Sequence, residues 1–192
     1  MNSDFYIENL PHCPDSEYFG GIATRIWYAL VDDFSKISIV QSGDFEGFKI
    51  VKKENITLYG QKELKYIDVF LEQNAITEKT QGATRRQKLI TEFRFLILGF
   101  TARNLGFVSK LRNRALIFII PDNNGNIWIF GNKKNAAYLT DASSRTEQKI
   151  DDDSVVELTY SSNSELMLYD GNIEDIRVIG GFSSGFSKGF RV

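Results

Sequence analysis

Residues 116–130 read LIFIIPDNNGNIWIF, and this stretch decides the fold. Two apolar runs, residues 116–120 and residues 127–130, flank a polar segment that contains the pair Asn124 and Gly125. An Asn-Gly pair supplies the positive φ angles that a tight turn between two antiparallel strands requires. The stretch therefore predicts a β-hairpin.

Short runs of the same kind lie on both sides of this hairpin. Upstream, residues 22–30 place bulky side chains alternately on each face, which indicates a strand buried on both sides or at an interface. Downstream, short strands are expected around residues 136–140, 155–160 and 166–169, separated by turn-rich polar segments. The chain also contains 15 Phe, 8 Tyr and 2 Trp, and aromatic residues favour strands. We therefore predict a mainly β fold.

One helix is predicted directly before residues 116–130. Thr101 is placed to cap its first turn, and Leu105, Val108 and Leu111 recur on one face at helical spacing. Serial short strands with a single helix are typical of a β-sandwich or a partly closed barrel with one flanking α-helix.

A second, longer β-hairpin is predicted over residues 63–98, which contain no proline. Its apex is polar, at residues 80–84, and its base is apolar, with residues 66–71 expected to pair with residues 90–98. Residues 72–88 carry almost nothing to bury, so an arm of about nine residues on each side would project roughly 30 Å from the body. Because such a ribbon is barely stable alone, we expect it to pair with another subunit. A long loop without a partner is the alternative.

The 192 residues fit one domain with an extension at each end. Residues 1–19 hold two of the three prolines and no clear periodicity, so we expect an N-terminal arm. Residues 20–179 form the predicted β domain, and residues 180–192 form a Gly-Phe repeat tail. In an extended tail, the rings of Phe182, Phe186 and Phe190 would share one face and dock on a neighbouring copy. The alternative is a flexible low-complexity end.

No pattern for catalysis, metal binding or cofactor binding is found. The only His and Cys, His12 and Cys13, are neighbours in the arm, where nothing holds them facing each other. Phosphate-binding glycine loops are absent. Residues 151–153 are three Asp that we expect in a solvated loop, and residues 122–126 resemble a calcium loop in composition only, because the Gly falls one position early. We read residues 122–126, and Asp32 with Asp33, as turns. An enzyme is therefore the least favoured class.

The charge and the apolar pattern exclude two further classes. A formal net charge of −2 and a pI near 5.5 argue against general attraction to nucleic acid phosphates. No apolar run approaches the roughly 20 residues that span a bilayer, and the N-terminus lacks the pattern of a signal peptide, so we expect neither a membrane anchor nor export. One Cys cannot form an internal disulfide, which fits assembly in a reducing cytosol. Arg85, Arg86, Lys79 and Lys88 near the hairpin apex would contact an acidic partner or DNA, or only keep the tip solvated.

The order of these features resembles the tail tube proteins of phages, notably the divergent versions in phages of Bacteroidetes-type hosts. The resemblance covers residues 20–172. It rests on the polar-tipped hairpin, on the strand TEFRF at residues 91–95, on the helix that follows, and on residues 116–132. In this last block a strand, an Asp-Asn-Asn-Gly turn, an Ile-Trp-Ile strand and a Gly follow one another.

This resemblance implies a β-sandwich or small barrel with a flanking helix, arranged in a hexameric ring whose inner strands close into a continuous barrel. Stacked rings would conduct DNA through the lumen without binding it specifically. The chain would be a structural virion protein of the tail, assembled in the host cytoplasm, with itself and other tail proteins as partners and with no cofactor. The expected subunit-interface residues are Lys79, Gly82, Arg85, Arg86, Phe182, Phe186 and Phe190.

Three alternatives remain open at this point. The N-terminal arm and the Gly-Phe tail could belong to a neck, hub or tail-completion ring instead of a repeating tube. Similar folds also form the inner tubes of contractile injection systems. A third alternative, from another class, is a β-sandwich module that binds a glycan or a receptor through exposed aromatic residues such as Trp27 or Trp128.

Overall fold

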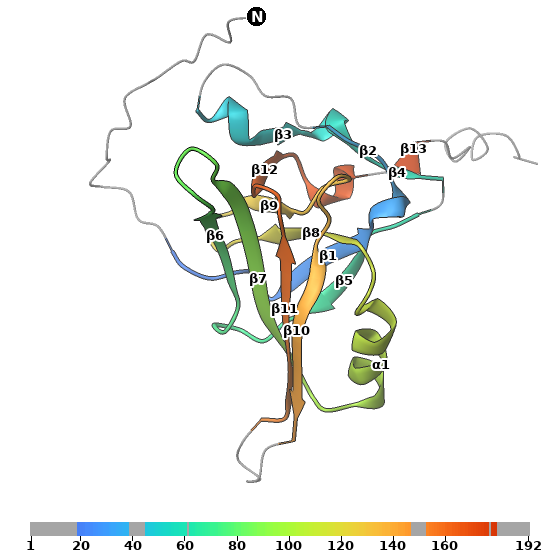
Figure 1. Cartoon of the computed structure of the whole chain (residues 1–192). Coiled ribbons are helices and arrows are strands. Elements are labelled where there is room, and N and C mark those ends of the chain that lie inside the picture. Colours follow the sequence, from blue (N-terminus) through green and yellow to red (C-terminus); the bar gives the residue numbers. More distant parts are fainter. Residues whose placement is uncertain (1–18, 39–44, 61, 147–152, 177, 180–192) are drawn as a thin grey trace, which may run out of the picture.

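The computed structural model describes residues 19–38, 45–60, 62–146, 153–176 and 178–179. This part of the chain is mainly β, with open sheets and one α-helix (Figure 1), so the predicted fold class is confirmed in its β-sandwich form. Four short 3-10 turns, η1 (Val31–Asp33), η2 (Gly47–Lys49), η3 (Lys53–Asn55) and η4 (Ile173–Asp175), connect some of these strands. The helix and strands are α1 (Ala102–Leu111), β1 (Arg25–Leu30), β2 (Phe34–Ile37), β3 (Ile50–Lys52), β4 (Ile56–Tyr59), β5 (Lys65–Asp68), β6 (Ala75–Gln81), β7 (Lys88–Leu98), β8 (Leu116–Pro121), β9 (Ile127–Phe130), β10 (Tyr138–Arg145), β11 (Val155–Ser162), β12 (Met167–Asp170) and β13 (Val178–Ile179).

The predicted hairpin at residues 116–130 is confirmed and lies in the middle of a six-stranded sheet. β8 and β9 pair antiparallel, with Phe118 opposite Phe130, and the sheet order is β3-β12-β9-β8-β1-β5. At the turn, the amide of Asp122 donates to the carbonyl of Asn126 at 2.9 Å, and Gly125 has a φ of 84°. A positive φ is the conformation that glycine adopts without strain.

β8 is apolar at every position because a core lies on each of its faces. Leu116, Phe118 and Ile120 belong to a first core, whereas Ile117 and Ile119 belong to a second core. All five side chains are fully buried. The second core is closed by a small three-stranded sheet, ordered β13-β4-β2, together with β3. Burial on both faces explains a continuous apolar run in place of an alternating one.

The first core joins the six-stranded sheet to a four-stranded sheet, ordered β10-β11-β7-β6. Ring centroids of Phe93 and Phe95 lie 5.7 Å and 6.2 Å from that of Phe118, and the ring of Tyr160 lies 4.8 Å from it. Aromatic contacts at these separations stabilise the packing beyond the area they bury. In Figure 1 the strands of the four-stranded sheet cross in front of β8, β9 and β1, so the two sheets form a sandwich.

The predicted helix is confirmed, including its cap. The Oγ1 of Thr101 accepts a hydrogen bond from the amide of Asn104 at 3.2 Å. Phe107 packs edge-to-face on Tyr28 of β1, with ring centroids 5.7 Å apart. α1 therefore flanks the first core through Val108 and Leu111 of the predicted apolar face and through Phe107, which the prediction did not include.

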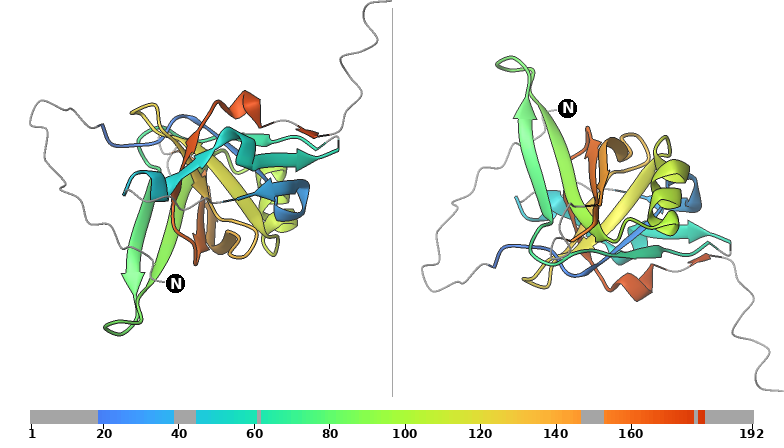
Figure 2. Two further views of the ribbon diagram at one scale, coloured as in Figure 1. Left: turned by 90° about the horizontal axis from the view of Figure 1, so that it is seen from above. Right: turned by 90° about the horizontal axis from the view of Figure 1, so that it is seen from below.

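The second hairpin exists, but its predicted base is wrong. β6 and β7 pair from Ala75 opposite Arg94 to Gln81 opposite Lys88, and the hairpin protrudes from the body in Figure 2. Residues 65–68 do not continue it. They form β5, which pairs with β1 in the six-stranded sheet.

The chain changes sheets between Val69, whose amide donates to the carbonyl of Thr24 at 2.8 Å, and Phe70, whose amide donates to the carbonyl of Leu96 of β7 at 2.8 Å. Glu72 has a φ of 65°, and the side chain of Asn74 accepts from the amide of Leu96 at 3.1 Å and donates to the carbonyl of Phe70. The route through β5 buries Ile67 and, just beyond it, Val69 in the first core. Burying these two side chains stabilises the fold more than continued pairing of residues 65–68 with β7 would.

Candidate subunit interface

The tip of the β6–β7 hairpin brings together the four predicted interface residues that the structure describes. Lys79 lies on β6, and Gly82, Arg85 and Arg86 lie in the turn that leads to β7. Every residue from 77 to 88 is exposed. The other three predicted residues, Phe182, Phe186 and Phe190, lie outside the described residues.

The turn at the tip has a defined backbone conformation. Gly82 has a φ of 126°, and a Cβ built at this position would lie 2.6 Å from the carbonyl oxygen of Arg86. The amide of Arg86 donates to the carbonyl of Ala83 at 2.9 Å, and Arg85 has a φ of 68°. Because a side chain at position 82 would collide with backbone, the turn requires glycine there.

The tip carries excess positive charge. The ammonium of Lys79 pairs with Glu92 across the hairpin, with Nζ 2.7 Å from Oε1. Within the described part of the chain, no ion pair neutralises Arg85, Arg86 or Lys88. The tip therefore carries three cations that no described ion pair neutralises.

The base of the hairpin is fixed to the segment before β12. Thr91 is fully buried, and its Oγ1 donates to the carbonyl of Ser164 at 2.7 Å. The Oε2 of Glu78 accepts from the amide of Leu166 at 2.6 Å, and its Oε1 lies 3.4 Å from the Nζ of Lys49. Since Glu78 lies opposite Thr91, the free part of each arm begins only beyond this pair. The projection is therefore shorter than the sequence predicted.

The outward face of the four-stranded sheet carries charges in opposite-sign pairs. On this face Lys79 pairs with Glu92, and Arg94 of β7 pairs with Glu157 of β11. Strand register places all four residues on one side of the sheet, away from Phe93 and Phe95. The charges of these four residues therefore cancel, and the same face also carries the exposed side chains of Tyr138 and Leu98.

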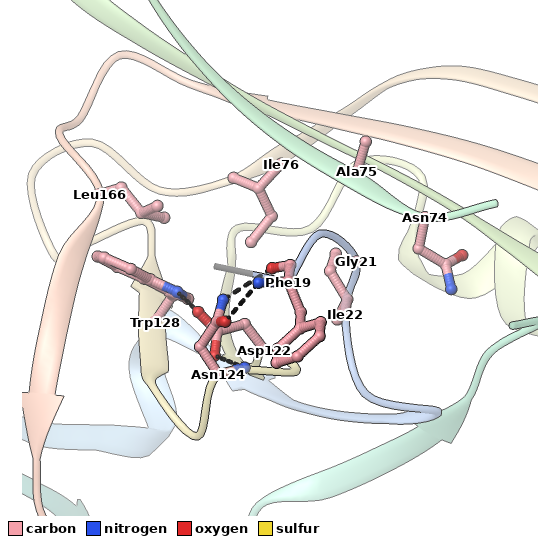
Figure 3. A pocket seen from close by; sticks show the side chains of 10 residues that line it. All are labelled: Phe19, Gly21, Ile22, Asn74, Ala75, Ile76, Asp122, Asn124, Trp128 and Leu166. Carbon is pink, nitrogen blue, oxygen red and sulfur yellow. Dashed lines mark hydrogen bonds between the residues drawn. The ribbon is translucent and has the colours of Figure 1, made fainter. Parts of the chain in front are cut away.

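A pocket of about 330 Å³ lies at the base of the hairpin, between the start of β6 and the β8–β9 turn (Figure 3). We call it the base pocket. Its apolar walls come from segments far apart in the sequence: Phe19, Ile22, Ile76, Trp128 and Leu166. Sequence reasoning did not find this pocket.

The polar groups around the base pocket are already hydrogen-bonded. The carboxylate of Asp122 accepts from the Nε1 of Trp128 at 2.8 Å and from three amide donors of the turn, the amides of Asn124 and Asn126 and the side chain of Asn126. The side chain of Asn124 makes two hydrogen bonds of 2.8 Å to the backbone of Phe19. Figure 3 shows the bonds that join Asp122 to Trp128 and Asn124 to Phe19.

Burial and hydrogen bonding oppose each other at Asp122. Burial alone raises the pKa of its carboxyl, but the hydrogen bonds from Asn126, Trp128 and Asn124 together outweigh burial and hold the pKa below its ordinary value. A carboxylate with this many internal donors has no free ligand position for calcium. The turn prediction for residues 122–126 is therefore confirmed.

The other acidic candidates are not brought together. Asp32 and Asp33 lie in η1, and Asp33 pairs with Lys62 at 2.8 Å. Asp153 is exposed just before β11, whereas Asp151 and Asp152 lie outside the described residues, as do His12 and Cys13. Across the described ranges, no group of three His, Cys, Asp or Glu side chains could hold a metal ion. In the same ranges, no helix has the length and apolarity needed to cross a membrane.

The two Trp side chains are partly buried, and Trp128 also lines the base pocket. Trp27 is partly buried against the second core, and Trp128 is partly buried against the first core. Comparisons of the chain with protein-family models, with curated proteins and with solved structures find no match.

Proposed function

We propose that the chain is a structural subunit of a homo-oligomeric ring of a phage tail, and that stacked rings form a tube that conducts DNA. The observation that carries this proposal is the four-stranded sheet. Its two outer strands, β6 and β10, each have a partner on one side only among the described strands. Unpaired edges of this kind bind further strands.

The directions of the two edge strands suit ring closure. All neighbours in the sheet are antiparallel, so β6 and β10 run in opposite directions. They lie on opposite sides of the sheet in Figure 1. If β6 of one copy pairs with β10 of the next, the antiparallel pattern continues, and a closed ring leaves no free edge.

The outward face of this sheet supports a lumen that does not hold DNA. Its charges form the pairs Lys79–Glu92 and Arg94–Glu157. Binding to DNA grows with the number of phosphates that cations neutralise, and paired cations neutralise few. The cations Arg85, Arg86 and Lys88 are confined to the tip, which suits a contact with a neighbouring ring.

Two related assemblies and one other class compete with this proposal. A neck, hub or tail-completion ring would use the same edges but would not stack, and an inner tube of a contractile injection system would stack in the same way. A glycan-binding or receptor-binding module is less supported. Trp27 and Trp128 are partly buried, and the polar groups around the base pocket are engaged within the chain.

Native mass spectrometry and negative-stain electron microscopy of the purified full chain test the proposal. We expect rings, with stacking at high protein concentration. A strictly monomeric chain at high concentration would refute the proposal.

Two adjacent proline variants on β10 provide a matched control for the strand edge. Ala142 and Ser143 are both exposed, and their amides point to opposite sides of the strand. One of the variants Ala142→Pro and Ser143→Pro removes an amide that faces β11, and the other removes an amide that faces the open edge. We expect the variant that lacks the edge-facing amide to fold and to lose ring formation. Normal rings from a folded variant of each kind would contradict edge pairing.

A further inference from the structure

We propose that the base pocket receives a Phe side chain from the Gly-Phe tail of a second copy of the chain. This inference rests on the proposed ring assembly, because it needs a neighbouring copy. The inference gives the base pocket a ligand, and it gives the side chains of Phe182, Phe186 and Phe190 a binding site.

The chemistry of the base pocket selects an apolar ligand. Ile76, Trp128 and Leu166 form its walls and are partly buried, and the ring of Phe19 is 61% exposed beside them. The carboxylate of Asp122 and the amide of Asn124 are engaged in hydrogen bonds within the wall. Because these side chains are already hydrogen-bonded, an aromatic ring, which needs no polar partner, fits the pocket without displacing a bond.

The size of the base pocket also suits one side chain. Its volume of about 330 Å³ lies at the lower end of the range for small-molecule sites. A docked ring would cover Phe19, Ile76 and Leu166, and burying one aromatic side chain removes about 150–250 Å² of its surface from water.

The tail has the composition of a ligand for this pocket. Its Phe residues recur every four positions and are separated by Gly and Ser, which lets a ring enter without steric conflict from large neighbours. The tail also carries Lys188 and Arg191 and no acidic side chain. Among the described residues that line the pocket, the only charged side chain is the carboxylate of Asp122, so the two cations of the tail meet no like charge there.

The position of β13 favours a second copy over the same copy. The tail follows β13, which pairs with β4. Figures 1 and 2 place β13 on the opposite side of the fold from β6 and β9, which border the pocket. The 13 residues from 180 to 192 reach at most about 45 Å when extended. The tail therefore starts away from the pocket of its own copy, which favours the pocket of a neighbouring copy.

A peptide added to the full-length chain tests this docking directly. The receiving protein carries Trp27→Phe, which leaves Trp128 in the pocket as the single tryptophan, and Ser in place of Phe182, Phe186 and Phe190. The probe is a synthetic peptide of residues 180–192. We expect a saturable change in Trp128 emission, and no change with a peptide whose Phe residues are replaced by Ser.

Pocket variants separate specific docking from general stickiness. Ile76→Glu places a charge in the pocket wall and should weaken peptide binding by about tenfold or more. The matched control is Leu98→Glu, an exposed apolar position on β7 outside the pocket, which should leave binding unchanged. Equal weakening by both variants, or no saturable change in the parent protein, would overturn the docking site.

Concentration dependence decides between a second copy and the same copy. With an intact tail, the emission of Trp128 should change with protein concentration if docking occurs between copies. Emission that is independent of concentration, yet altered by Phe→Ser changes in the tail, would show docking within one copy and would overturn the proposal.

Failure of this inference differs from failure of the ring proposal. Rings that form without a peptide-dependent change in Trp128 leave the ring proposal intact and overturn the docking. Peptide binding to a chain that forms no rings leaves the pocket's ligand identified and refutes the ring.

Discussion

Asp122→Asn is the substitution that most directly tests the turn at the centre of the fold. The carboxylate accepts four hydrogen bonds, at 2.8 Å from the amides of Asn124 and Asn126, at 2.9 Å from the Nδ2 of Asn126 and at 2.8 Å from the Nε1 of Trp128. An amide has one acceptor oxygen, and its NH₂ group would face donors. Asn at this position therefore loses the bonds on one side of the carboxylate.

The expected cost follows from the number and kind of these bonds. A hydrogen bond to a charged acceptor contributes about 1.5–3 kcal/mol, and at least two such bonds are lost. Because Asp122 is only partly buried, water replaces part of this contribution. We expect the free energy of unfolding at neutral pH to fall by about 3 kcal/mol, a value near the lower end of the sum.

The same substitution should remove part of the acid sensitivity. The pKa of Asp122 is held below its ordinary value of 3.8, so its ionised form stabilises the fold above that pH. This stabilisation is lost as pH falls through the lower pKa of the folded state, where the carboxylate becomes protonated. The stability of the Asn variant should therefore depend less on pH below 3.8.

Urea unfolding, followed by tryptophan fluorescence at neutral and acidic pH, measures both effects. Asp153→Asn is the matched control, because Asp153 is exposed. A loss of less than about 1 kcal/mol for Asp122→Asn, equal to that of the control, would refute the role of Asp122 as the acceptor that organises the turn.

Tyr160→Phe should raise the free energy of unfolding by about 1 kcal/mol, because the buried hydroxyl of Tyr160 has no partner in the described structure; a loss in urea unfolding would contradict this. Burial raises the pKa of Tyr160, and burial with nearby carboxylates raises the pKa of Tyr169 to about 12. Because the unfolded chain then ionises first, the free energy of unfolding should fall as pH rises above 10; a flat profile in alkaline urea titrations would exclude this. Gly82→Ala should destabilise the hairpin tip by about 1–3 kcal/mol and reduce ring formation. Gly106→Ala in α1, where an added Cβ meets nothing, should stabilise the protein by about 0.5–1 kcal/mol. Thermal unfolding and electron microscopy of the two variants distinguish these effects.

Features with local causes were predictable from the sequence. The β8–β9 hairpin follows from Asn124 and Gly125 between two apolar runs, and the start of α1 follows from the hydroxyl of Thr101. Both depend on contacts between residues a few positions apart. Local signals of this kind do not require knowledge of the rest of the fold.

Features that depend on distant partners were not predictable in the same way. β2, β3 and β4 are three or four residues long, and they are stable because Phe34, Val51 and Ile56 pack in the second core. A signal for that core was present in residues 116–120, whose five consecutive apolar side chains require cover on both faces of the strand. The identity of the covering strands is not contained in that signal.

The same difference between local and distant contacts decides which parts of the candidate site could be predicted. The tip was found because residues 72–88 contain almost nothing to bury, a property of one continuous segment. The base pocket is formed by residues 19–22, 74–76, 122–128 and 166, which only the completed fold brings together. No single segment among these differs from an ordinary strand end or turn.

The polar composition of residues 72–88 has two different causes, and the distinction bears on assembly. Glu78 is polar because it accepts from the amide of Leu166, and its strand partner Thr91 donates to the carbonyl of Ser164. Beyond this pair, residues 79–88 are polar because they face solvent. The hairpin is therefore anchored at its base and free only at its tip. In the proposed contact with a neighbouring copy, a hairpin anchored at its base would lose less conformational freedom than a free ribbon, so binding through Arg85 and Arg86 would carry a small entropic cost.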